Sequence, residues 1–70
     1  MKRKKIIMND HRIIVEEINF YYPKNVEIKE KTQTDYRIYV EFTNRERLTL
    51  KYDSSDSRDN ALRTLDHEFD

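Results

Sequence analysis

Residues 36–69 read YRIYVEFTNRERLTLKYDSSDSRDNALRTLDHEF, and the spacing of their apolar side chains changes after Tyr52. Up to Tyr52 the apolar positions alternate, which is typical of strands with one buried face. Between Ala61 and Phe69 they recur at the spacing of a 3.6-residue helix. This stretch therefore predicts a β-hairpin that leads directly into a C-terminal helix.

The predicted hairpin pairs residues 36–43 with residues 48–52 across a turn at residues 44–47. Asn44 is expected to take the left-handed backbone that tight hairpins need. Alternation places one set of apolar side chains on the core-facing side: Tyr36, Ile38, Val40, Phe42, Leu48, Leu50 and Tyr52.

The predicted helix spans residues 53–69. Oxygen atoms of Asp53, Ser54 and Ser55 are suited to capping the free N–H groups of its first turn. Its buried stripe is expected to comprise Ala61, Leu62, Leu65 and Phe69. The side chains expected on its exposed side include Arg58, Asn60, Arg63 and Asp66.

The first third of the chain is less regular. Residues 5–8 and 12–15 are interpreted as two short strands joined by a turn at residues 9–11. A β-bulge near Glu16 would let Ile18, Phe20 and Tyr22 face the core together with Ile13 and Val15. Pro23 lacks a backbone N–H and is expected to end this segment.

Two polar segments are interpreted as irregular. Residues 24–34 are expected to form a loop, with an edge strand through Val26 and Ile28 as the alternative. Residues 1–4 are expected to be a flexible basic arm. Together these elements predict a single domain over residues 1–70. Its expected fold class is α+β: a small antiparallel sheet of three or four strands with one C-terminal α-helix packed on one face.

The hairpin-plus-helix segment resembles the ending of small proteins from phages and low-GC bacteria. In those proteins a strand ending in Tyr-Asp-Ser leads into an acidic, capped helix. The residues here that carry the resemblance are Tyr52, Asp53, Ser54, Arg58, Asp59, Leu62 and Leu65. The resemblance covers residues 36–69 and implies a phage or mobile-element context.

The composition argues against several classes of function. The 70 residues carry 14 basic and 14 acidic side chains, so the electrostatic case for nucleic-acid or anionic-membrane binding is weak. The absence of cysteine excludes disulfides and sulfur-based zinc sites, and the absence of glycine excludes phosphate-cradling loops. We expect neither a cofactor nor a membrane partner.

No constellation of residues points to catalysis. His67 lies beside Asp66 and could be drawn into a metal site with Asp70, but a solvated histidine at a helix C-terminus is favoured. His11 lies in a predicted turn. Glu16 and Glu17 are adjacent and would point to opposite faces of a strand. We therefore expect no catalytic residue, no metal site and no enzymatic activity.

A partner-binding surface is expected on the sheet face opposite the helix. Tyrosine and arginine are enriched where protein interfaces concentrate their energy. Alternation predicts one candidate set on that face: Tyr21, Arg37, Tyr39, Thr49 and Lys51.

The expected function is that of a small interaction protein in the cytoplasm of a bacterial host, which binds a host protein and inhibits or modulates it. A homodimer is also expected, because one helix covers only one face of the sheet. The alternative is a small nucleic-acid-binding regulator that uses the sheet face and the basic N-terminal arm.

Overall fold

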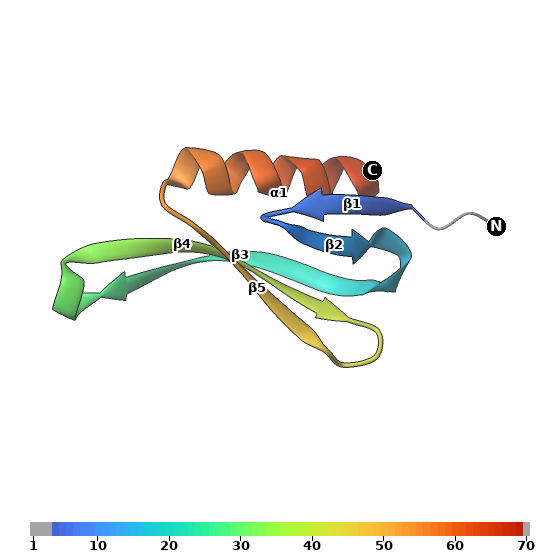
Figure 1. Ribbon diagram of the computed structural model, residues 1–70, viewed down its shortest axis with the longest axis horizontal. Helices are drawn as coiled ribbons and strands as arrows, with labels where there is room; N and C mark the ends of the chain where they lie inside the picture. Colours follow the sequence, from blue (N-terminus) through green and yellow to red (C-terminus); the bar gives the residue numbers. More distant parts are fainter. Residues whose placement is uncertain (1–3, 70) are drawn as a thin grey trace.

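A computed structural model describes residues 4–69 and confirms the α+β class with a C-terminal helix. The strands are β1 (Lys5–Met8), β2 (His11–Ile14), β3 (Ile18–Ile28), β4 (Gln33–Phe42) and β5 (Arg47–Tyr52). The helix α1 spans Ser55–Phe69, and short 3-10 turns lie at Val15–Glu17 and Lys29–Lys31. Strands β3, β4 and β5 form an antiparallel sheet in that order. Within residues 4–69, strands β1 and β2 pair only with each other and form a second sheet (Figure 1).

The β4–β5 hairpin forms where the sequence predicts it, but its turn uses a different residue. Arg45 has the left-handed backbone, with φ of 72°, so the assignment of that conformation to Asn44 is wrong. The Asn44 side chain instead accepts a hydrogen bond at Oδ1 from the Glu46 backbone N–H, at 3.0 Å. Asparagine is favoured in turns for this local bond as well as for its tolerance of left-handed backbone.

The prediction that Pro23 ends a strand and that residues 24–34 form a loop is wrong. Strand β3 continues through Pro23, which lies opposite Ile38, and ends at Ile28. The edge-strand alternative is therefore correct for residues 24–28. Proline is tolerated because β3 is an edge strand, where a missing N–H costs no ladder bond on the open side. Beyond Asn25 and Tyr36 the strands form a two-stranded ribbon that extends past the sheet (Figure 1).

Helix α1 is capped by Ser54, whose Oγ accepts a hydrogen bond from the Ser57 backbone N–H at 3.2 Å. Leu65 is fully buried, and Ala61 and Leu62 are half-buried against the core. Phe69, at the end of the predicted stripe, is about half exposed. Asp53 and Ser55 are not the capping residues, because only the Ser54 side chain has the position that reaches the first turn.

The prediction that Arg58 is exposed is also wrong. Its side chain is buried, and its Nη1 donates to Oδ1 of Asn25 at 2.8 Å. Its guanidinium carbon lies 5.7 Å from the centroid of the Tyr36 ring, and its Nε bonds the Asp59 carboxylate at 2.8 Å. Arg58 thus joins the first turn of the helix to the beginning of the β3–β4 ribbon.

The β1–β2 hairpin lies on the same side of the three-stranded sheet as α1 (Figure 1). It turns through Asn9 and Asp10, both with positive φ, which is the pairing that a two-residue hairpin favours. The buried core is shared among all layers: Met8, Ile13, Ile18, Ile38, Val40, Leu50 and Leu65. Within residues 4–69, α1 is too short and too polar to cross a membrane.

The predicted basic arm does not include Lys4. The Lys4 backbone N–H donates to the Glu16 carboxylate at 2.9 Å, and its carbonyl accepts from the Val15 N–H at 2.9 Å. Its ammonium forms an ion pair with Glu68 of α1 at 2.6 Å. Residues 1–3 of the predicted arm lie outside the described residues.

Candidate functional site

A bulge at Asn19 decides which side chains of β3 face the core. Ile18 lies opposite Phe42, but Phe20 lies opposite Glu41, so two residues of β3 share one position on β4. The extra residue reverses the alternation that starts at Ile18. The prediction that Phe20 and Tyr22 face the core is therefore wrong, and each is 46% exposed. The bulge was predicted near Glu16, where the structure has a 3-10 turn instead.

Tyr21 consequently lies on the helix side, and its predicted placement with Tyr39 is wrong. Its hydroxyl donates to the Asp66 carboxylate at 2.5 Å. Its ring centroid lies 5.6 Å from that of Phe69. Tyr21 holds the C-terminal turns of α1 against the sheet, so we remove it from the candidate site.

The other predicted site residues do share the face opposite α1. Arg37 lies opposite Lys51, and Tyr39 lies opposite Thr49, on the adjacent strands β4 and β5. We call this surface the bare face, because no element within residues 4–69 covers it (Figure 1). By register, the bare face carries Phe20, Tyr22, Lys24, Val26, Asp35, Arg37, Tyr39, Glu41, Arg47, Thr49 and Lys51.

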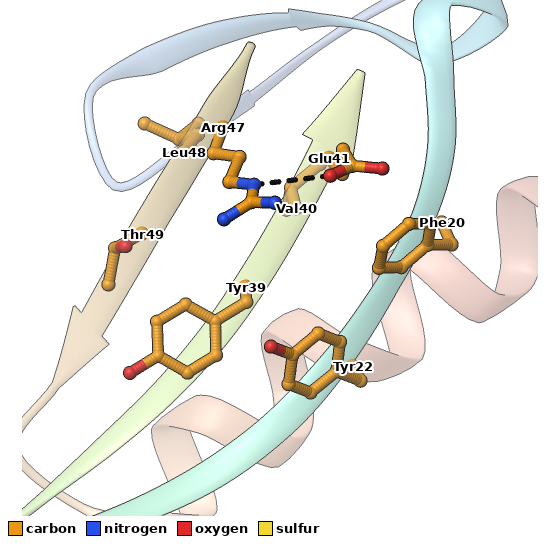
Figure 2. Close-up of a pocket in the computed structure, with 8 residues that line it drawn as sticks. All are labelled: Phe20, Tyr22, Tyr39, Val40, Glu41, Arg47, Leu48 and Thr49. Atoms are coloured by element: carbon orange, nitrogen blue, oxygen red, sulfur yellow. Dashed lines mark hydrogen bonds and ion pairs between the residues drawn. The ribbon is translucent and has the colours of Figure 1, made fainter. Parts of the chain in front are cut away.

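Three aromatic rings form the centre of the bare face. The Phe20 and Tyr22 ring planes differ by 16°, with centroids 6.2 Å apart. Tyr22 and Tyr39 lie directly opposite each other on β3 and β4, with centroids 5.3 Å apart. Figure 2 shows the three rings close together on β3 and β4, with the helix behind the sheet. Phe20 and Tyr22 are each 46% exposed, and Tyr39 is half-buried between its neighbours.

These rings border a shallow depression of about 360 Å³. Its far wall is formed on β4 and β5 by Glu41 and Arg47, whose side chains are joined by an ion pair at 3.1 Å (Figure 2). The depression is therefore bordered by aromatic rings on one side and by a charged pair on the other. Aromatic side chains next to charged ones are typical of protein-binding surfaces.

Next to the rings, Arg37 is held in a small polar network. Its Nη2 bonds the Asp35 carboxylate at 2.9 Å, and its Nη1 donates to the Tyr39 hydroxyl at 3.2 Å. The bond from Arg37, with a second from Gln33, lowers the pKa of Asp35 below its ordinary value of 3.8. The same Asp35 carboxylate raises the pKa of Arg37. Asp35 and Arg37 are therefore both charged at neutral pH and hold Tyr39 in position.

A row of three cations runs across the sheet beside this network. Lys24, Arg37 and Lys51 are direct cross-strand neighbours on β3, β4 and β5. Like charges directly opposite each other destabilise a sheet. Within residues 4–69 only Arg37 of the three forms an ion pair. The Asp35 carboxylate offsets part of this repulsion, because it pairs with Arg37 and is also attracted to Lys51. Lys24 and Lys51 themselves form no ion pair within residues 4–69.

The described residues include no group of three or more histidine, cysteine, aspartate or glutamate side chains that could hold a metal ion. His67 is exposed on α1, and His11 is exposed at the start of β2. Glu16 interacts with the Lys4 backbone, and Ser54 caps the helix. These histidine, glutamate and serine side chains all lie away from the bare face.

Sequence reasoning missed Phe20, Tyr22 and Lys24 as members of the bare face. In the sequence, Ile18, Phe20 and Tyr22 are spaced two residues apart, which predicts that all three share one face. The extra residue Asn19 breaks this relation, so Ile18 faces the core whereas Phe20 and Tyr22 lie on the bare face. A signal was present in Asn19, an asparagine between two apolar residues at the start of the strand. Asparagine is depleted in regular strands, so its presence is compatible with an irregular position.

No known protein-family model matches the sequence, and neither the curated proteins nor the solved structures compared with it are significantly similar to the chain. The bare face must accordingly be interpreted from its own geometry.

Proposed function

We propose that this chain is a small, non-enzymatic interaction protein that binds another protein through the bare face. The observation that carries the proposal is the outward-facing cluster of Phe20, Tyr22 and Tyr39 on an uncovered sheet. Exposed aromatic clusters of this kind mark binding surfaces, because a folded monomer gains little by leaving several rings side by side in water.

The bare face supplies both kinds of contact that interfaces use. Tyr22 and Tyr39 offer large areas of ring at a low cost in conformational entropy. Arg37 is already fixed by Asp35, so it loses little freedom when a partner binds. We expect Tyr22 and Tyr39 to be the energetic centre of the interface, with the charged side chains around them contributing specificity.

A protein partner fits the charges better than a nucleic acid does. The carboxylates of Asp35 and Glu41 lie on the same face as the cations. A phosphate backbone would pass its regularly spaced charges close to both carboxylates, which is unfavourable. A protein surface places its charges individually and avoids them. Nucleic-acid binding stays the alternative, because aromatic rings on a sheet also serve as platforms for stacking bases.

The biological setting is part of the same proposal. The resemblance of residues 36–69 to small phage and low-GC bacterial proteins supports an origin in a phage or mobile element. The partner would then be a protein in the cytoplasm of the bacterial host. The chain would inhibit or modulate it by occupying a surface, since binding requires no chemistry.

A site-specific cross-linking experiment tests this function. A photoreactive amino acid replaces Thr49, which is exposed within the bare face, or Arg63, which is exposed on α1. We expect irradiation in host cells to couple one protein to the Thr49 variant and not to the Arg63 variant. The coupled protein is identified by mass spectrometry, purified and titrated with the unmodified chain.

The titration is then repeated with a Tyr22→Ala, Tyr39→Ala double variant. We expect at least a tenfold loss of affinity, which corresponds to about 1.4 kcal/mol. Ile7→Ala is the control, because Ile7 is 71% exposed but lies on β1. Equal coupling from both positions, or unchanged affinity of a folded double variant, would refute the assignment of the bare face.

A further inference from the structure

The charges of the bare face are unbalanced although the chain as a whole is neutral. The face carries four basic side chains, Lys24, Arg37, Arg47 and Lys51, and two acidic ones, Asp35 and Glu41. Each acidic side chain is already paired with an arginine, at 2.9 Å for Asp35 and 3.1 Å for Glu41. The two lysines are left without an ion-pair partner among residues 4–69.

The two lysines stand on either side of Arg37 in the cationic row, and the aromatic row of Tyr22 and Tyr39 lies next to it. A partner seated on the rings would exclude water from the neighbouring row. Ion pairs formed there would be stronger than ordinary surface pairs, because the local dielectric constant falls. The repulsion within the row would then be relieved by the bound partner.

The edges of the sheet are poorly suited to binding, which directs a partner to the face. Edge strand β3 carries Pro23, which cannot donate a hydrogen bond to an added strand. On edge strand β5, the Asn9 side chain donates to the Lys51 backbone carbonyl at 3.3 Å. Both features interfere with the continuous ladder that strand addition needs.

We infer that the partner presents an acidic surface, with carboxylates that pair with Lys24 and Lys51 while an apolar patch covers Tyr22 and Tyr39. This inference rests on the proposed function and specifies the chemistry of the partner. A second copy docked face to face is disfavoured, because both faces would carry the same excess of positive charge. A nucleic acid is disfavoured because its phosphates would lie close to the carboxylates of Asp35 and Glu41.

The test is charge reversal with a matched control. Lys24→Glu with Lys51→Glu reverses two charges on the bare face. Lys29→Glu with Lys31→Glu makes the same change in net charge on the exposed 3-10 turn at the ribbon tip. The probe is the host protein identified by cross-linking from position 49, and its affinity is measured at low and at high salt.

We expect the Lys24/Lys51 variant to bind at least tenfold more weakly, a change of about 1.4 kcal/mol, and to lose most of its salt dependence. The Lys29/Lys31 variant should change affinity by less than about twofold, as is usual for charges outside an interface. Equal losses in both variants would show a general charge effect and overturn the inference. Unchanged affinity in the Lys24/Lys51 variant would do the same while leaving the proposed function intact.

Two further measurements test whether a nucleic acid or a second copy of the chain binds the bare face instead. Labelled oligothymidine that binds the chain in a salt-sensitive way, and is released by the Lys24/Lys51 reversal, would overturn the acidic-protein assignment in favour of nucleic acid. Sedimentation that shows a dimer broken by the same reversal would overturn it in favour of a second copy. Loss of binding in the Tyr22/Tyr39 variant alone would support the proposed function but refute the acidic partner.

Discussion

Arg58 and Asn25 lie 33 residues apart and are joined by a hydrogen bond of 2.8 Å from the arginine Nη1 to the asparagine Oδ1. The bond connects the first turn of α1 to the strand β3 at the point where the ribbon leaves the sheet. Because Arg58 is buried and also covers the Tyr36 ring, it fixes the position of the helix relative to the ribbon.

Replacement of Arg58 by alanine should therefore destabilise the fold. We expect the free energy of unfolding to fall by about 2 kcal/mol, since a hydrogen bond to a charged group contributes about 1.5–3 kcal/mol. Urea unfolding monitored by circular dichroism measures the change. Arg63→Ala is the control, because Arg63 is exposed on the same helix and should change stability by less than about 0.5 kcal/mol. Equal effects would show that the Arg58 contacts are not formed.

Leu65 is the most completely buried side chain of α1. Leu65→Ala should cost about 2–5 kcal/mol, the usual range for truncating a buried leucine. The core of a domain of 70 residues rarely supplies more than about 3–5 kcal/mol, so a loss of this size should leave the variant largely unfolded at moderate temperature. Leu62→Ala is the matched comparison and should cost less, because Leu62 is half-buried. A reversed order in thermal unfolding would mean that a different stripe of the helix faces the core.

Tyr21 and Tyr22 lie on opposite faces, and removal of their hydroxyl groups should distinguish them. Tyr21→Phe loses the bond to Asp66 and should lower the free energy of unfolding by about 1 kcal/mol. Tyr22→Phe should leave stability within about 0.5 kcal/mol, since its ring is exposed on the bare face. Denaturant unfolding of both variants measures these free energies. A loss of stability confined to Tyr22→Phe would contradict the bulge at Asn19.

Stability should also depend on the ionisation of Asp35. The hydrogen bond from Arg37 lowers the pKa of Asp35 in the folded protein below its ordinary value of 3.8. Its contribution to stability is therefore fully present above pH 3.8 and is lost as the pH falls through the lower, folded value. Carboxyl chemical shifts measured by NMR should show a titration midpoint for Asp35 below 3.8.

An Asp35→Asn variant provides the control for this prediction. It should lose the part of the acid dependence that arises from Asp35, because the amide does not titrate. Urea midpoints of both proteins should converge as the pH is lowered. A midpoint for Asp35 at or above 3.8 would indicate that the pair with Arg37 is not formed in solution.

The sequence was sufficient to predict the elements in which pattern and position agree. The hairpin from Tyr36 to Tyr52 alternates without interruption, so Arg37, Tyr39, Thr49 and Lys51 were placed on the correct face. The helix has a clear stripe and a serine cap. In these segments the local periodicity and the tertiary packing favour the same structure.

Elsewhere the fold depends on contacts that local patterns do not contain. The bulge at Asn19 moved Tyr21 to the helix side and brought Phe20 and Tyr22 to the bare face. Strand β3 tolerates Pro23 because β3 lies at the edge of the sheet. The order of the strands in the sheet cannot be read from the local sequence pattern. Arg58 is buried because Asn25, far away in the sequence, accepts its hydrogen bond.

The bulge at Asn19 also affects how this chain could diverge through evolution. Because Asn19 is an extra residue between Ile18 and Phe20, a descendant that lost it would still have Ile18 and Tyr21 inside and Phe20 and Tyr22 outside. Single-residue deletions at this point would thus be neutral for the interaction surface, although they would shift the sequence pattern by one. Related chains would therefore be aligned more reliably by structural register, that is, by the residue of β3 that lies opposite Val40. An alignment of their apolar positions without gaps would be less reliable.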